Sequence, residues 1–163
     1  MQVHLPALLI AFCALPAQAL EPACDPYLKA AEKTTAQPAR QMVSDLGGGF
    51  KTEAVVKDGK MYMKVDGSWM KGPPTFTQME ANLNAEMRSG KIKLWDCKKL
   101  GRETVDGIAT TVYSFQIQMQ GLPAPKAPAK VYIGDDGLVY AQTSDGTKVR
   151  YRYTGVTAPT VGK

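Results

Sequence analysis

Apolar and polar residues alternate along several short segments of the chain. Between positions 108 and 119, Tyr113, Phe115 and Ile117 alternate with polar side chains. Successive side chains of a strand point to opposite faces of its sheet, so this alternation predicts strands with one face against a core. On this basis we predict strands at 40–45, 52–57, 60–65, 68–71, 108–119, 130–133, 138–143 and 148–153.

The dipeptide Asp-Gly recurs five times between these segments. It suits a type I′ turn, because both central residues of that turn take positive φ. Four of the five pairs have strand-type residues close on both sides, which predicts several β-hairpins. The pairs are Asp58-Gly59, Asp66-Gly67, Asp106-Gly107, Asp136-Gly137 and Asp145-Gly146.

Two segments have helical rather than strand periodicity. Apolar residues three and four positions apart predict a helix over 75–89, with Thr77 and Glu80 as a capping box and Gly90 as its end. The stripe consists of Phe76, Met79, Leu83 and Met87.

A shorter helix is predicted from Asp25-Pro26 to about Ala36, with Asp25 as N-cap. Two helices over one curved antiparallel sheet give an α+β fold. The Pro-rich and Gly-rich segments 72–74 and 121–128 interrupt the pattern, and the second is long enough for a loop.

The first residues form an apolar run at 7–15, followed by Pro16 and the small-residue pattern Ala17-Gln18-Ala19. This is typical of a secretory signal peptide cleaved before Leu20. We therefore expect a signal peptide at 1–19, one domain at 20–163 and a periplasmic protein.

The alternatives are a retained membrane anchor and a lipid-modified amino terminus. The run is too short to span a bilayer, and no later segment is apolar enough to form a transmembrane helix. Phe12 before Cys13, and residues 21–23 before Cys24, are unlike a lipidation site.

Cysteine usage points to an oxidising compartment. Loss of Cys13 with the signal leaves Cys24 and Cys97, for which a disulfide is the default expectation and two free thiols the alternative. Such a bridge would tie the amino-terminal helix to the sheet.

The charge pattern argues against nucleic acid as a partner and leaves other classes open. The chain has 20 basic and 15 acidic residues, and no block of consecutive basic residues of the kind that binds nucleic acid. The basic stripe Lys148, Arg150 and Arg152 could meet anionic headgroups, although a solvated strand face is the ordinary interpretation.

Enzyme chemistry is largely excluded. His4 lies in the predicted signal, so the mature chain has no histidine for a catalytic triad or a zinc site. Residues 47–49 are three glycines without the Gly-Lys-Ser/Thr of a phosphate loop. We therefore predict no catalytic residue, metal or cofactor. Four carboxylates fall in or near turns, where Asp is expected for local hydrogen bonds: Glu103, Asp135, Asp136 and Asp145.

Methionines and aromatic residues are numerous on the faces assigned inward. Thioethers repack around variable apolar shapes, which suits a cavity, although a Met-rich filled core is the plainer interpretation. Candidate residues for an apolar cavity are Met61, Met63, Trp69, Phe76, Met79, Leu83, Tyr113, Phe115 and Met119.

The order of several short pieces resembles the LolA-like half-barrel superfamily of envelope proteins. The resemblance covers residues 40 to 159. The first piece is Gly-Lys-Met-Tyr-Met-Lys-Val-Asp-Gly-Ser-Trp at 59–69. The later pieces are 97–107 followed by Tyr113, then 130–133 with 136–138, and finally 151–153 before Ala158-Pro159. The resemblance implies an incomplete, strongly curved antiparallel barrel, with helices across its mouth and an apolar cavity. The residues by which LolA itself closes its cavity find no match, so a lipoprotein-carrier role does not transfer.

These observations lead to two hypotheses. The first is a non-catalytic periplasmic carrier or binding protein for a lipid, acyl chain or apolar peptide. The second is an interaction module with a filled core, which binds another envelope protein through its sheet edge or through the segment 123–128. That segment could also be a plain strand connection.

Overall fold

The computed structural model describes residues 21–119, 121 and 127–162. The predicted signal peptide and most of the loop at 121–128 lie outside these residues. No helix in the described part of the chain is long and apolar enough to cross a bilayer.

Four of the five Asp-Gly pairs form the expected two-residue hairpin turns. Both residues of each pair have positive φ, for example 49° at Asp58 and 74° at Gly59. The fifth pair differs, because Asp136 lacks a positive φ and Gly137 closes a longer turn by donating to the carbonyl of Gly134 at 2.8 Å.

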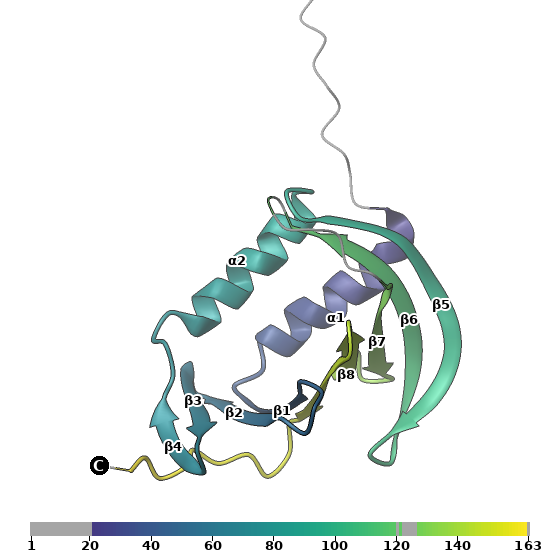
Figure 1. Cartoon of the computed structure of the whole chain (residues 1–163). Coiled ribbons are helices and arrows are strands. Elements are labelled where there is room, and N and C mark those ends of the chain that lie inside the picture. The colour runs from purple at the N-terminus through teal and green to yellow at the C-terminus, as the bar shows by residue number, and fades with distance from the viewer. Residues whose placement is uncertain (1–20, 120, 122–126, 163) are drawn as a thin grey trace, which may run out of the picture.

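The described strands form one antiparallel sheet in the order β4-β3-β2-β1-β9-β8-β7-β6-β5. The sheet is strongly curved and does not close, since β4 and β5 are its two edges (Figure 1). The strands are β1 (Ala39–Asp45), β2 (Lys51–Lys57), β3 (Lys60–Val65), β4 (Ser68–Lys71), β5 (Lys93–Val105), β6 (Ile108–Gln118), β7 (Ala129–Gly134), β8 (Val139–Ser144) and β9 (Thr147–Arg152).

Sequence reasoning missed β5, which at 13 residues is as long as any element in the described residues. Its outer edge is unpaired and most of its side chains are exposed, so no alternation marks it. The pairing with β6 is also shifted near Trp95 and again near Lys99, and Asp96 has a positive φ of 53°. Such bulges break the period of two on which the strand predictions rested.

Two helices lie on the concave side of the sheet, as Figure 1 shows. These are α1 (Asp25–Thr35), preceded by a short 3-10 turn η1 (Pro22–Cys24), and α2 (Phe76–Arg88). The observed fold is therefore α+β, as predicted. Both helices have nearly the predicted bounds, and Gly90 follows α2 with a φ of 78°.

Both predicted N-caps are wrong. Asp25 is the first residue of α1 rather than its cap, because the preceding 3-10 turn leads directly into the helix. Thr77 lies inside α2, and Glu80 turns away from the helix terminus to pair with Arg40 on β1. A tertiary ion pair has thus replaced the local capping box.

The core lies between α1, the carboxyl end of α2 and strands β5 to β8. Leu28 of α1 and Val131 of β7 are fully buried, and Tyr27 stacks on Phe115 with 4.2 Å between ring centroids. Cys24 and Cys97 form the expected disulfide, with 5.1 Å between their Cα atoms. The bridge joins the start of α1 to edge strand β5.

We predict that removal of the disulfide lowers the free energy of unfolding substantially. The bridge closes a span of 73 residues, and the loss of chain entropy in the unfolded state corresponds to about 4 kcal/mol. Urea unfolding of the protein carrying Cys24→Ser and Cys97→Ser, against the oxidised parent, measures this difference. A loss below about 1 kcal/mol would contradict a stabilising role for the bridge.

Candidate functional site

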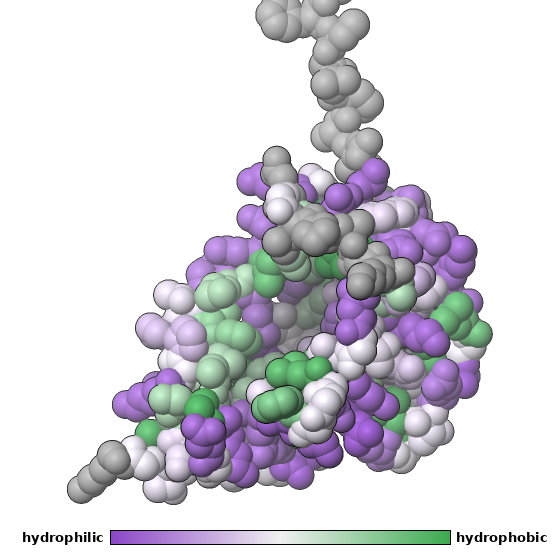
Figure 2. Space-filling model, viewed as in Figure 1, coloured by the Kyte–Doolittle hydropathy of each residue, from purple (hydrophilic) through white to green (hydrophobic). Residues whose placement is uncertain are grey.

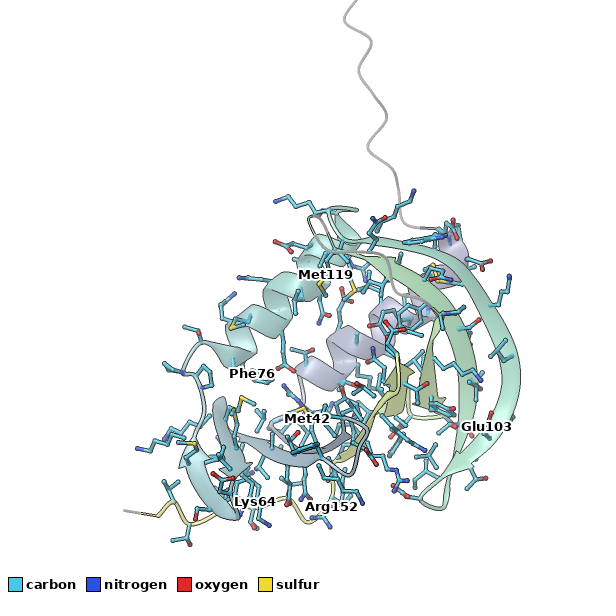
Figure 3. All side chains as sticks on the ribbon, in the orientation of Figure 1. Met42, Lys64, Phe76, Glu103, Met119 and Arg152 are labelled. Carbon is cyan, nitrogen blue, oxygen red and sulfur yellow. A yellow bond between two sulfur atoms is a disulfide. The ribbon has the colours of Figure 1, made fainter. Side chains whose placement is uncertain are left out.

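A row of apolar side chains crosses the concave face of strands β9, β1, β2, β3 and β4. The antiparallel register aligns Tyr151, Met42, Ala54, Met63 and Met70 directly across neighbouring strands. We call these five residues the methionine row. They face the helices, because Tyr151 lines a cavity beneath α2 and Figure 3 shows Met42 on the helix side of the sheet.

The next row of the same face is Arg40, Val56 and Met61. Gly72, which follows β4, lies directly over Met61: its N–H donates to the Met61 carbonyl at 2.9 Å, and a Cβ at Gly72 would lie 2.8 Å from the Met61 Cγ. A glycine is therefore needed at the junction that leads from the sheet into α2.

The apolar stripe of α2 is only partly buried. Met87 at the carboxyl end is 6% exposed, whereas Leu83 is 39% and Met79 53% exposed. α2 lies above β3 and beside α1, so this stripe borders the space over the methionine row. Figure 2 shows a hollow there, with hydrophobic side chains along α2 at its side. We call this hollow the groove.

The contact between the two helices is polar. Asn84 donates to the Thr35 hydroxyl at 3.0 Å, and Arg88 makes two hydrogen bonds of 2.8 Å to the Glu32 carboxylate. Because these side chains occupy the face of α2 that meets α1, Met79 and Leu83 are left free to face the groove.

A cavity of about 190 Å³ lies beneath α2, between the two helices and strands β8 and β9. Leu83 and Tyr151 belong to its lining and also to the groove. Polar groups enter it from Glu80, Asn84 and Gln142. The space between α2 and the sheet is thus not completely filled by protein side chains.

Arg40 ties β1 to both helices. Its side chain is fully buried; one guanidinium nitrogen donates to the Thr35 carbonyl at 3.1 Å and the other pairs with Glu80. Burial raises the pKa of the Glu80 carboxyl above its ordinary value, and the nearby Arg40 guanidinium only partly offsets this. The Arg40 guanidinium thus favours the charged form of the Glu80 carboxyl against the effect of burial.

The structure brings together five of the nine residues predicted to line an apolar cavity. Met61 and Met63 lie on the concave face of β3, while Phe76, Met79 and Leu83 lie on α2. Figure 3 shows Phe76 at the start of α2, on the side of the helix near Met42.

The other four predicted residues lie elsewhere. Trp69 aligns with Lys64 on the outer face of the sheet, and the Lys64 ammonium lies 5.7 Å from its ring centroid. Phe115 is 1% exposed and belongs to the filled core. Met119 follows the end of β6 and is 38% exposed.

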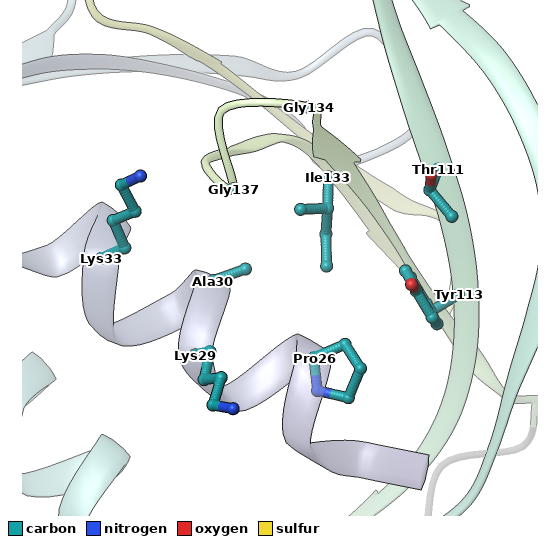
Figure 4. Close-up of a pocket in the computed structure, with 9 residues that line it drawn as sticks. All are labelled: Pro26, Lys29, Ala30, Lys33, Thr111, Tyr113, Ile133, Gly134 and Gly137. Atoms are coloured by element: carbon teal, nitrogen blue, oxygen red, sulfur yellow. The ribbon is translucent and has the colours of Figure 1, made fainter.

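Tyr113 lines a separate cleft of about 310 Å³ on the other side of α1 (Figure 4). Ala30 and Lys33 face this cleft from α1, opposite Ile133 of β7. α1 therefore divides the concave side into two spaces, and the predicted residues fall on both.

Sequence reasoning missed Met42, Met70 and Tyr151 as groove residues. For Met70 a signal was available, because the two-residue Asp66-Gly67 turn aligns residue 65 with 68 and hence Met63 with Met70. For Tyr151, alternation with Arg150 and Arg152 indicated an inward face. Nothing in the sequence placed Tyr151 beside Met42, because β1 and β9 are neighbours in the sheet but far apart in the chain.

No group of three or more potential metal ligands occurs in the part of the chain that the structure describes. Two of the carboxylates considered above for chemistry have structural partners. Asp135 pairs with Arg102 at 2.9 Å, and Asp136 accepts from the Leu138 N–H and the Tyr140 hydroxyl. Asp136 thus makes the local hydrogen bonds expected of a turn residue, whereas Asp135 pairs with a residue of another strand.

Comparison with known proteins finds similarity in structure alone. No protein-family model and no curated protein matches the chain. LprF from Mycobacterium bovis is 15% identical in sequence, and the match covers 88% of this chain and 100% of the LprF chain with a TM-score of 0.50. Lipoprotein LppX from Mycobacterium tuberculosis is 12% identical, with coverages of 85% and 96% and a TM-score of 0.52.

We predict that Arg40→Met destabilises the protein by about 3 kcal/mol, because it leaves the Glu80 carboxylate partly buried without its partner. The double variant Arg40→Met, Glu80→Met should recover much of the loss. Urea unfolding of both variants measures this, and a double variant less stable than Arg40→Met alone would contradict it.

The deficit of Arg40→Met should also depend on pH. Without Arg40, burial holds the pKa of Glu80 above its unfolded value, so the folded state is penalised once the pH exceeds the unfolded pKa. The deficit should therefore be smaller in acid than at neutral pH. A deficit independent of pH would show that lost packing, not charge, is the cause.

Proposed function

We propose that this chain, which has the LolA-like half-barrel fold of LprF and LppX, binds a lipid or another acyl chain in the groove and carries it without catalysis. The observation that supports this most directly is the pair of facing apolar surfaces. Met79 and Leu83 of α2 are left substantially exposed opposite the methionine row.

The driving force would be transfer of the chain out of water. Each CH₂ buried contributes about 0.8 kcal/mol. The methionine row crosses five strands, which corresponds to about 19 Å at the usual strand spacing, a length that suits an extended acyl chain. Flexible thioethers would adapt to chains of different shape.

Uptake requires no chemistry and little rearrangement. α2 contacts α1 through a hydrogen bond of the buried Asn84 and through the exposed pair of Arg88 with Glu32, whereas Met79 and Leu83 of its apolar stripe are free. A ligand would replace water over Met79 and Leu83 and leave the Arg40 anchor in place. Entry would follow small movements of α2 about its junction at Gly72.

We also propose that the protein acts in the periplasm. The disulfide between Cys24 and Cys97 requires an oxidising compartment, and the predicted signal peptide accounts for export. Mass determination of the intact secreted protein without reductant would reveal both cleavage before Leu20 and the bridge.

Binding of a protein partner along the open sheet edge is the alternative. The β5 edge is irregular, with two register shifts and a charged surface that includes Lys93, Lys98 and Arg102. Bulges and charges of this kind protect an edge from pairing with another strand. These features of β5 support the groove over the β5 edge as the binding site.

Native mass spectrometry of protein taken from the periplasm, combined with displacement of a fluorescent fatty acid, tests the proposal. Met79→Gln and Met63→Gln should each weaken binding about fivefold, since each removes roughly 1 kcal/mol of apolar contact. Leu100→Gln is the matched control, because Leu100 is as exposed as Met79 (52% against 53%) but lies on β5. Absence of a co-purifying lipid together with absence of displacement would overturn the proposal.

A further inference from the structure

The most exposed large apolar side chain in the described residues is Phe50, at 74%. It ends the loop between β1 and β2, which begins at Leu46, itself 51% exposed. Exposure of two large apolar side chains on one short loop is costly in water and marks interaction surfaces.

This loop has a defined conformation. The Leu46 N–H donates to the Phe50 carbonyl at 2.9 Å, the Phe50 N–H to the Gly47 carbonyl at 3.1 Å, and the Gly47 N–H to the Asp45 carboxylate at 3.0 Å. Glycines 47–49 all have positive φ, so the tight path of the chain requires them. The apolar pair is thus presented by an ordered turn.

The loop lies at the mouth of the groove. It projects from the ends of β1 and β2 toward the viewer in Figure 1, and Figure 2 shows hydrophobic side chains gathered there, beside the hollow. It also neighbours the β8–β9 turn, since a Cβ on Gly47 would lie 3.9 Å from the Gly146 carbonyl oxygen.

We call the edge of the molecule formed by the Leu46–Phe50 loop and the β8–β9 turn the rim. Lysines line the outer face of the sheet behind this rim. The register aligns Lys130 of β7 with Thr143, Lys148 of β9, Asp45 and Lys51 of β2 across successive strands. Every second strand therefore contributes a lysine, about 10 Å from the next at the usual strand spacing. We call Lys51, Lys130 and Lys148 the lysine row. It ends at the base of the Leu46–Phe50 loop.

The ammonium groups of this row are available to a partner. All three lysines are exposed, and no described carboxylate lies within 4.0 Å of any of them. Arg150 and Arg152 continue the same outer face, since they alternate with Tyr151, which points to the groove. One rim thus combines exposed apolar side chains with a basic face.

We propose that this rim docks on an anionic lipid bilayer, with Leu46 and Phe50 inserted at the headgroup level and the lysine row on the headgroups. Lysines extend their charge toward a charged surface while their stems cover apolar area, and apolar residues flanked by basic ones are typical of interfacial binding. The inference rests on the proposed function, because docking here would bring the groove mouth to the lipid.

Vesicle flotation with the purified protein tests the inference. Binding is expected to equimolar phosphatidylglycerol and phosphatidylcholine vesicles, and to be much weaker with phosphatidylcholine alone. Leu46→Ser with Phe50→Ser should lower the partition coefficient about tenfold. Lys51→Gln, Lys130→Gln and Lys148→Gln should each lower it about fivefold, and added salt should weaken binding of the parent.

The matched control is Leu100→Ser with Ile108→Ser, which removes two exposed apolar residues away from this rim, and it should bind vesicles like the parent. Circular dichroism checks that each variant is folded. Equal binding to both vesicle types, or binding unaffected by the loop and lysine variants, would overturn the inference. Loop and lysine variants that lose vesicle binding but still displace the fatty-acid probe like the parent would support the inference. A parent that binds the probe but no vesicle refutes the docking and leaves the proposed function intact.

Discussion

The buried charge of Arg40 organises the helices over the sheet. A guanidinium removed from water must find its partners inside the molecule. The two terminal nitrogens of Arg40 find them in the last carbonyls of α1 and in Glu80 of α2, whereas its Nε has no partner among the described residues. β1 lies between β2 and β9 near the middle of the sheet. One side chain from a central strand thereby sets where α1 ends and where α2 lies. The disulfide holds the opposite end of α1.

The groove follows from this arrangement. α1 is held at both ends and fills the centre of the concave face, whereas α2 is held by polar contacts along one side. Glu80, Asn84 and Arg88 make those contacts, and of the apolar stripe only Met87 at the carboxyl end is buried in the core, so Met79 and Leu83 stay exposed. The polar anchoring of a helix is therefore what leaves an apolar surface open to a ligand. The same surface would be buried if α2 packed by its stripe.

The nine predicted cavity residues show where local reasoning is sufficient. Met61 and Met63 lie on the concave face, as alternation within their strand predicts. Trp69 was grouped with them although the neighbouring turn already aligns it with Lys64. Tyr113 and Phe115 do face the helices, but their surroundings are a separate cleft and a filled core. Which inward side chains meet empty space depends on what the helices cover, and alternation does not contain that information.

The sequence by itself determined most strands, four hairpin turns, the two helices and the cysteine pair, because these depend on residues close in the chain or on simple counting. Only the tertiary structure revealed β5, whose bulges and exposed edge erase the periodic signal. It also assigned Glu80 to Arg40 in place of a helix cap, since a buried guanidinium attracts a carboxylate more strongly than exposed backbone N–H groups do. The groove itself arises from contacts between segments far apart in the sequence, which local sequence patterns do not predict.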